Sequence, residues 1–213
     1  MSDFSREGKG KLKTIVTDAE NKSGSTAILG PVRLSHMAAF KPRANKLRKC
    51  DEFSVVVVIE KTDTELLKFV RERIQHALVK KFGKPLAKFD TCLKDGDTET
   101  DNDGQARYPG CMFISTRADI DNAPVILSPK SIPLDLSDTQ GWQSGDFGYV
   151  KLDFFGYDTD KNGVSTRWKA VQFAAKGVPF GKGQQDAGQV ANEFGDVEGV
   201  EAEPAAAGGS FLD

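Results

Sequence analysis

Histidine and cysteine are both scarce in this chain of 213 residues, and their scarcity narrows the chemistry that the chain can support. The two histidines, His36 and His76, offer little material for a His-rich metal centre or a His-based catalytic triad. The three cysteines, Cys50, Cys92 and Cys111, are odd in number and far apart, which fits neither a disulfide framework nor a zinc site with paired ligands. We therefore expect reduced thiols, no metal, no cofactor and no enzymatic activity.

Long apolar runs are missing as well. The longest uninterrupted run covers residues 55–59, which is far too short to span a bilayer, and the first residues, MSDFSREGKGKLK, lack the apolar stretch of a signal peptide. We expect a cytoplasmic protein that does not contact a membrane. The 21 glycines and 9 prolines indicate many turns and favour β structure over a helical bundle.

Positive charge is absent from the C-terminal end of the chain. Of the 31 acidic residues seven follow Gln185, whereas all 29 Lys and Arg precede it, so a basic body is followed by an acidic tail. The densest basic stretch covers residues 41–49 and contains Lys41, Arg43, Lys46, Arg48 and Lys49. A polyanion is the expected partner of such a body.

Polarity also divides the chain into three parts. Residues 1–26 are polar and have no clear period, which indicates a flexible N-terminal arm. Residues 183–213 are rich in Gly, Gln, Ala and Glu and cannot bury enough apolar surface to fold, so we expect a disordered acidic tail. Residues 27–182 should form one folded domain.

One amphipathic helix is expected over about residues 63–82. Thr62 and Glu65 have the spacing of a capping box, and Gly83 followed by Pro85 should end the helix. Apolar residues recur at helical spacing between these signals: Leu66, Val70, Ile74, Ala77, Leu78 and Phe82.

The other apolar patterns are typical of strands. Residues 53–60, FSVVVVIE, are apolar almost without interruption, which predicts a strand buried on both faces. Residues 27–42 indicate an extended segment broken at Gly30-Pro31, and we place the basic residues after it in a loop. Further strands are expected at residues 111–118, 123–127, 147–158 and 164–175, the last two forming a hairpin signalled by Asn162-Gly163.

The first strand of this hairpin carries an alternating aromatic pattern. Its odd-numbered positions from 147 to 157 include Tyr149, Lys151, Phe155 and Tyr157, and its even-numbered positions are mainly apolar. Exposed rings beside cations suit single-stranded nucleic acid, because bases stack on rings and phosphates pair with cations. The alternative is that the rings pack the core, and the sequence leaves this open for each ring.

The acidic loop begins with residues 95–103, and residues 99–104 of this loop, like residues 158–163, resemble the first half of a calcium-binding loop. Each lacks the glutamate required at the twelfth position, where Gly110 and Lys169 stand, so we interpret both as solvated turns. A metal-dependent nuclease that uses the first loop is the weakest functional alternative. The other alternative is a β-rich virion or sugar- or protein-interaction module.

Four segments together resemble a family of phage-encoded single-stranded DNA-binding proteins: GPVRLSHMAAFKP (30–42), KDGD (94–97), YPGCMFISTRA (108–118) and QSGDFGYVKLDFFGYDTDKNGVSTRWKAVQ (143–172). The resemblance implies a mainly β, OB-fold-like five-stranded antiparallel barrel with extensions. It also implies sequence-independent coating of single-stranded DNA during replication or recombination in the host cytoplasm. The predicted helix departs from many OB-folds, because it directly follows an early strand.

Candidate DNA-binding residues follow from the basic stretches, the exposed aromatics and this resemblance. They are Arg33, His36, Phe40, Lys41, Arg43, Lys46, Arg48, Lys49, Arg107, Tyr108, Arg117, Tyr149, Lys151, Phe155, Tyr157, Trp168 and Lys169. The tail resembles those of bacterial and phage single-strand binders, and its tip, Phe211, Leu212 and Asp213, is expected to bind replication proteins such as a polymerase, helicase or primase. A homodimer is one of the oligomeric states that the sequence leaves open.

Overall fold

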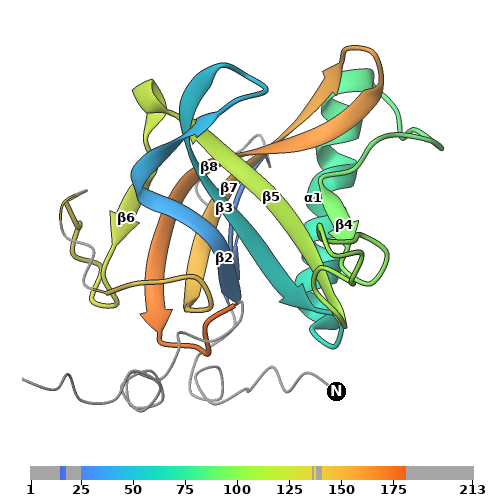
Figure 1. Cartoon of the computed structure of the whole chain (residues 1–213). Coiled ribbons are helices and arrows are strands. Elements are labelled where there is room, and N and C mark those ends of the chain that lie inside the picture. The colour runs from blue at the N-terminus through green and yellow to red at the C-terminus, as the bar shows by residue number, and fades with distance from the viewer. Residues whose placement is uncertain (1–14, 18–24, 136, 138–140, 181–213) are drawn as a thin grey trace, which may run out of the picture. The chain divides into compact units, whose positions relative to one another are not determined.

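A computed structural model describes residues 15–17, 25–135, 137 and 141–180 of the chain (Figure 1). The elements are β1 (Ile15–Thr17), β2 (Thr26–Asn45), β3 (Cys50–Glu60), α1 (Thr64–Phe82), β4 (Leu93–Asp95), β5 (Cys111–Asp119), the short 3-10 helix η2 (Ile120–Asn122), β6 (Val125–Leu127), β7 (Phe147–Asp158) and β8 (Asn162–Ala175).

Five strands form a closed barrel in the order β5-β3-β2-β7-β8, and each neighbouring pair is antiparallel. The barrel closes where β5 meets β8 in parallel, at the pair Arg117 and Arg167. This is the strand order of an OB-fold, so the expected five-stranded barrel is confirmed, with a parallel pairing at its closure. The short strands β1, β4 and β6 extend the sheet beside β2, β5 and β8.

The long strand β2 holds the barrel together because it pairs with β7 along its first half and with β3 along its second. The expected break at Gly30-Pro31 is a register shift within a continuous strand. Glycine is required there, since a Cβ at position 30 would lie 2.7 Å from the Tyr149 ring. The basic stretch was expected in a loop, but Lys41 and Arg43 lie on β2 and only residues 46–49 form the turn.

Helix α1 packs against β7, β8 and β2 through Leu66, Leu67, Val70, Ile74, Ala77 and Leu78, which confirms the expected apolar face. Its C-terminal end is as expected, because Gly83 adopts the left-handed conformation. The expected capping box is wrong: Asp63 occupies the N-cap, and the Thr62 hydroxyl donates to the Glu60 carboxylate instead. Within the described residues no helix is both long and apolar enough to cross a membrane.

Strand β3 is buried on both faces, as its continuous apolar run predicts. Val55, Val57 and Ile59 belong to the main core inside the barrel. Val56 and Val58 belong to a smaller cluster on the outside, which also contains Tyr108, Cys111 and Phe113. The loop that leads into β5 therefore covers the outer face of β3.

Three details of the chain differ from the sequence-based expectations. Ile15–Thr17 lies within the expected flexible arm but pairs with β2 as a strand. Leu93–Asp95, which ends at the first residue of the expected acidic loop, pairs with β5 as a strand. The hairpin between β7 and β8 is present, but its turn consists of residues 159–161, and Asn162 and Gly163 already pair with β7. The expected disordered tail, residues 183–213, lies outside the described residues.

Candidate nucleic-acid interface

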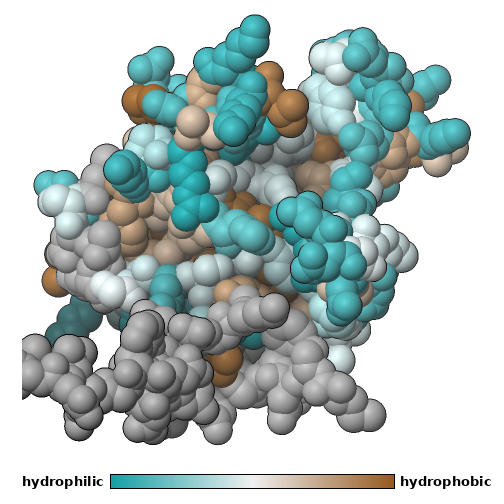
Figure 2. Space-filling model, in the orientation of Figure 1, coloured by the Kyte–Doolittle hydropathy of each residue, from teal (hydrophilic) through white to brown (hydrophobic). Residues whose placement is uncertain are grey.

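A groove lies between the turn at residues 46–49 and the β7–β8 hairpin, which are both at the top of Figure 1. Figure 2 shows the surface hollowed between these two projections, with hydrophilic residues on either side. The groove consists of two adjoining hollows of about 520 and 550 Å³ that share Arg117, Phe155 and Ser165. Its lining includes Arg48, Asp90, Lys94, Glu99, Arg107, Phe113, Ser115, Arg117, Asp119, Phe155, Tyr157, Ser165, Arg167 and Lys169.

Strand β5 forms the floor of the groove. Its side chains alternate, so Ser115 and Arg117 point outward and are exposed, while Ile114 and Thr116 are buried. Because β5 and β8 pair only at Arg117 and Arg167, the two strands diverge from this point. The divergence opens the space that the β7–β8 hairpin borders on one side.

The Phe155 ring is partly exposed on the outward face of β7 and lies in both hollows. The guanidinium carbon of Arg167 stands 4.2 Å from the centre of this ring, and the same guanidinium lies 3.7 Å from the Asp153 carboxylate. Arg167 is thereby held against the ring by a cation–π contact and an ion pair. The pair presents a flat surface and a positive charge side by side.

Tyr157 is fixed in one orientation at the far side of the groove. Its hydroxyl donates a hydrogen bond of 2.8 Å to the Asp90 carboxylate. Its ring lies against Gly163, where a Cβ would come within 2.5 Å of the ring, so glycine is needed for this approach. Burial and the Asp90 hydrogen bond raise the pKa of Tyr157 to about 12. The phenol is therefore neutral at physiological pH, and its ring is held in place.

Asp90 stays ionised because its carboxylate also accepts a hydrogen bond of 3.0 Å from the Lys94 ammonium. The hydrogen bonds from Tyr157 and Lys94 lower the pKa of Asp90. The groove as a whole is positive, with six cations (Arg48, Lys94, Arg107, Arg117, Arg167 and Lys169) and three acids (Asp90, Glu99 and Asp119) among its lining residues.

Seven of the candidate residues predicted from the sequence line this groove: Arg48, Arg107, Arg117, Phe155, Tyr157, Trp168 and Lys169. Lys46 and Lys49 are exposed on the turn beside Arg48. His36 and Arg43 are exposed on β2. Partial burial lowers the pKa of His36, and the charges of Arg107 and Arg43 lower it further, so these three side chains form one positive neighbourhood.

Three candidates are instead buried. Trp168 also borders the groove, but its side chain is only 1% exposed, and its indole N–H donates a hydrogen bond to the Ala170 carbonyl. The ring therefore packs in the core, which corrects the expectation that it stacks on a base. Arg33 is 6% exposed and lies between the rings of Phe147 and Phe180. Tyr108 is 3% exposed. We leave these residues out of the interface.

The remaining candidates lie away from the groove. Tyr149 and Lys151 line a different hollow, beside β2 and β6. Phe40 stacks on Phe173 with ring centres 5.9 Å apart, and Lys41 is exposed on β2. The expected partner-binding tip, Phe211, Leu212 and Asp213, lies outside the described residues.

Sequence reasoning missed several residues of the groove. Alternation along β8 places Arg167 on the same face as Lys169, but it does not say whether that face points outward, as the structure shows that it does. Asp90, Lys94, Ser115 and Ser165 gave no comparable signal. They come together only because the barrel closes and the segment before β4 folds against the hairpin.

The acidic loop is a network of turns. The Lys61 ammonium lies 2.6 Å from the Asp95 carboxylate and 2.5 Å from the Asp97 carboxylate, and its hydrogen bonds lower the pKa of both acids. The Asp101 carboxylate accepts hydrogen bonds from the backbone N–H groups of Asp103 and Gln105. In the part of the chain that the structure describes, no three His, Cys, Asp or Glu side chains converge to hold a metal.

Comparisons with known proteins identify the family of this chain. A family model described as "Enterobacter phage Enc34, ssDNA-binding protein" matches residues 25–203. Putative protein p50 of Acyrthosiphon pisum secondary endosymbiont phage 1 is 30% identical over 185 residues, which are 81% of this chain and 88% of that protein.

Solved structures show the same fold. The single-stranded DNA-binding protein from bacteriophage Enc34 in complex with ssDNA has a TM-score of 0.64 at 19% identity, and covers 81% of this chain and 99% of its own. A C-terminal truncation of the Enc34 protein has a TM-score of 0.62 at 18% identity, over 79% of this chain and 99% of its own. With a family match over most of its length, this chain belongs to the Enc34 family of phage single-stranded DNA-binding proteins.

Proposed function

We propose that the groove between the turn at residues 46–49 and the β7–β8 hairpin binds single-stranded DNA with little regard to sequence. The observation that carries the proposal is the Phe155 ring, partly exposed at the junction of the two hollows, with Arg167 against it and Arg117 beside it. Every base has a flat face that can stack on a ring, and every phosphate can pair with a cation. Contacts of this kind do not distinguish one base from another.

The relatives support this proposal. The Enc34 protein, whose fold this chain shares, is described in complex with ssDNA. Coating of exposed strands protects them and removes secondary structure by mass action, which are tasks of phage DNA replication and recombination. Neither task needs a catalytic residue or ATP, and the sequence contains no GxxxxGK[ST] phosphate-binding motif.

We propose a regulatory and recruiting role for the acidic tail. Phe180, the last described residue, packs against Tyr108 with ring centres 5.7 Å apart. The guanidinium of Arg107, which lines the groove, stands 5.7 Å from the same Tyr108 ring. The last described residue and a cation of the groove thus contact the same ring, and the seven acids that follow in the sequence suit competition with DNA.

The apolar tip of the tail, Phe211-Leu212 before Asp213, suits insertion into a pocket on a replication protein such as a polymerase, helicase or primase. A tail that only improves solubility is the alternative. A pull-down of such a partner with the full chain, compared with Phe211→Ala, distinguishes the two: a tail without specificity captures no partner, or captures the same amount in both forms.

The first experiment is a titration of fluorescent single-stranded and double-stranded oligonucleotides over a series of salt concentrations. It compares the full chain with a version that ends at Gln185. We expect single strands to bind more tightly than duplexes, with a log-log salt slope of about −0.7 for each phosphate contacted. The shortened version should bind more tightly, because it lacks the competing acids.

The outcomes separate the proposals. Equal affinity of the two versions overturns competition by the tail and leaves the groove proposal standing. Absence of single-strand binding by both versions at low salt overturns the groove proposal and favours a β-rich interaction module. Loss of labelled DNA in magnesium would instead indicate a nuclease.

A further inference from the structure

The turn between β2 and β3 presents a leucine to solvent at the edge of the groove. Leu47 is 96% exposed. The other exposed large apolar residues in the described part of the chain are less exposed, for example Ile132 at 58% and Val125 at 54%. Full exposure of an apolar side chain is unfavourable in water and is relieved by any apolar surface that covers it. Arg48, the next residue, lines the groove.

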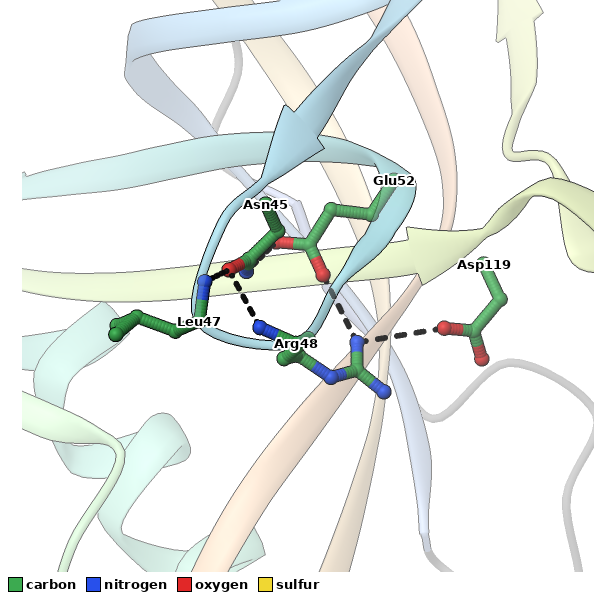
Figure 3. Close-up of polar contacts among 5 residues, drawn as sticks. All are labelled: Asn45, Leu47, Arg48, Glu52 and Asp119. Atoms are coloured by element: carbon green, nitrogen blue, oxygen red, sulfur yellow. Dashed lines mark hydrogen bonds and ion pairs between the residues drawn. The ribbon is translucent and has the colours of Figure 1, made fainter.

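The conformation of this turn is fixed by its neighbours (Figure 3). The Asn45 side-chain oxygen accepts hydrogen bonds from the backbone N–H groups of Leu47, at 3.0 Å, and Arg48, at 3.1 Å. The Asn45 amide nitrogen donates to the Glu52 carboxylate at 2.8 Å. The bond from Leu47 forms an Asx turn, and the bond to Glu52 ties this turn to the adjacent strand.

Arg48 anchors the other side of the turn. Its guanidinium lies 2.8 Å from the Glu52 carboxylate and 3.4 Å from that of Asp119. Figure 3 shows the Leu47 and Arg48 side chains pointing to opposite sides of the turn. With Arg48 held toward Asp119, the backbone cannot easily rotate to lay Leu47 on the barrel, so the leucine projects from a rigid support.

The charges around Leu47 suit a nucleic acid strand. Lys46 and Lys49 are exposed on either side, so phosphates that flank an inserted side chain would each meet a cation. Proteins that unstack DNA use this combination, an apolar wedge between bases and cations on the backbone. An aromatic ring lines the same groove at Phe155, where a displaced base can stack again.

We infer that Leu47 is a wedge that inserts between two neighbouring bases of the bound strand and separates them. This inference rests on the proposed binding of single-stranded DNA in the groove. Burial of Leu47 against the two base faces compensates for the lost base–base stacking. The turn thus opens stacked or weakly folded single strands, in addition to holding them.

The test uses the full chain and two oligonucleotides of equal length. One is oligo(dT), which stacks weakly, and the other is a run of dA with two adjacent 2-aminopurines, whose fluorescence rises when they unstack. The variants are Leu47→Ser, Leu47→Met as the conservative replacement, and Ile132→Ser as a control. Ile132 is also an exposed apolar residue but, unlike Leu47, it does not adjoin in the chain a residue that lines the groove.

We expect the wild type, Leu47→Met and Ile132→Ser to produce the same fluorescence rise at saturation. Leu47→Ser should lose roughly half or more of this rise and weaken binding to the dA run roughly threefold to tenfold more than binding to oligo(dT). Its thermal unfolding should be unchanged, because Leu47 is not part of the core.

An unchanged fluorescence rise in Leu47→Ser, whatever its affinity, overturns the wedge and leaves the groove proposal intact. Equal weakening on both oligonucleotides overturns it too, since a wedge must act against stacking. Failure of the wild type to bind either oligonucleotide is a different result, because it overturns the proposed function itself.

Discussion

The two ends of the β7–β8 hairpin carry similar residues but face different surroundings. Near the tip, Phe155 and Tyr157 face β5 and the segment that contains Asp90, and they line the positive groove. Near the base, Tyr149 and Lys151 face β2 and β6 and line another hollow. All four side chains occupy outward positions of the same strand.

The difference lies in what surrounds the rings. The hollow at the base has a volume of about 640 Å³, larger than either hollow of the groove, but its walls are mainly apolar and include Ile28, Val125 and Leu127. Among the described residues its cations are Lys151 and Lys169, and Lys169 also lines the groove. The groove has six cations and three acids among its lining residues, with Phe155 and Tyr157 between them. Affinity for a polyanion depends on cations more than on volume, so we propose that the tip, and not the base, binds DNA.

The largest expected effect concerns a ring of this hairpin that borders the groove but is buried in the core. Trp168→Ala removes a buried ring from the core and should lower the free energy of unfolding by about 3–5 kcal/mol. Urea unfolding measures this change, with Phe155→Ala as the partly exposed control, which should change it far less. If Trp168→Ala remained equally stable but lost DNA binding, Trp168 would belong to the DNA interface and not only to the core.

The tip and the base should differ most clearly in DNA binding. Phe155→Ala removes a stacking surface and should cost about 1–3 kcal/mol of binding free energy, whereas Tyr149→Ala should change binding little. Fluorescence titration with a single-stranded oligonucleotide measures both. The reverse order of the two effects would move the DNA to the hollow beside β6.

Salt dependence distinguishes the two ends by charge. Arg117→Gln removes one cation from the floor of the groove and should reduce the magnitude of the log-log salt slope by about 0.7. Lys151→Gln, at the base, should leave the slope unchanged. Equal reductions in both variants would show that the strand passes over both ends of the hairpin.

The smallest expected effect is a pH dependence from His36, which stands beside the groove. Burial and the charges of Arg107 and Arg43 lower the pKa of His36 in the free protein, and a bound phosphate should raise it. Because the bound pKa is then higher, binding takes up a proton, and affinity should increase as the pH falls from about 8 to about 5.5.

We expect this gain to be roughly twofold to fivefold and to disappear in His36→Gln. Titrations at fixed ionic strength measure it. A gain that persists in His36→Gln must come from another group and would separate His36 from the bound strand.

Much of the fold could be predicted because it depends on local patterns. The run at residues 53–60 predicted a strand buried on both faces, and the helical spacing from Leu66 to Phe82 predicted α1. The predicted capping box was wrong because the spacing of Thr62 and Glu65 does not specify where the Thr62 hydroxyl points. In the structure this hydroxyl donates a hydrogen bond to the Glu60 carboxylate instead of capping the helix.

The candidate site was predicted less completely. Alternation along β7 separated the outward Phe155 and Tyr157 from the buried Phe154. It could not show that Tyr149 on the same face lies beside a different hollow. Nor could it show that Trp168 points inward while its neighbours Arg167 and Lys169 point outward, because the pairing register with β7 was unknown.

The sequence by itself determined the basic body, the strands, the helix and the outward stripe of rings, because composition, hydrophobic period and side-chain alternation are local properties of the chain. Tertiary structure alone decided which cations meet which rings. The closure of β5 against β8 places Arg117 beside Phe155, and the packing of Asp90 against Tyr157 fixes the far side of the groove. Contacts between residues so distant in the chain depend on how strands pair and curve, which no local pattern specifies.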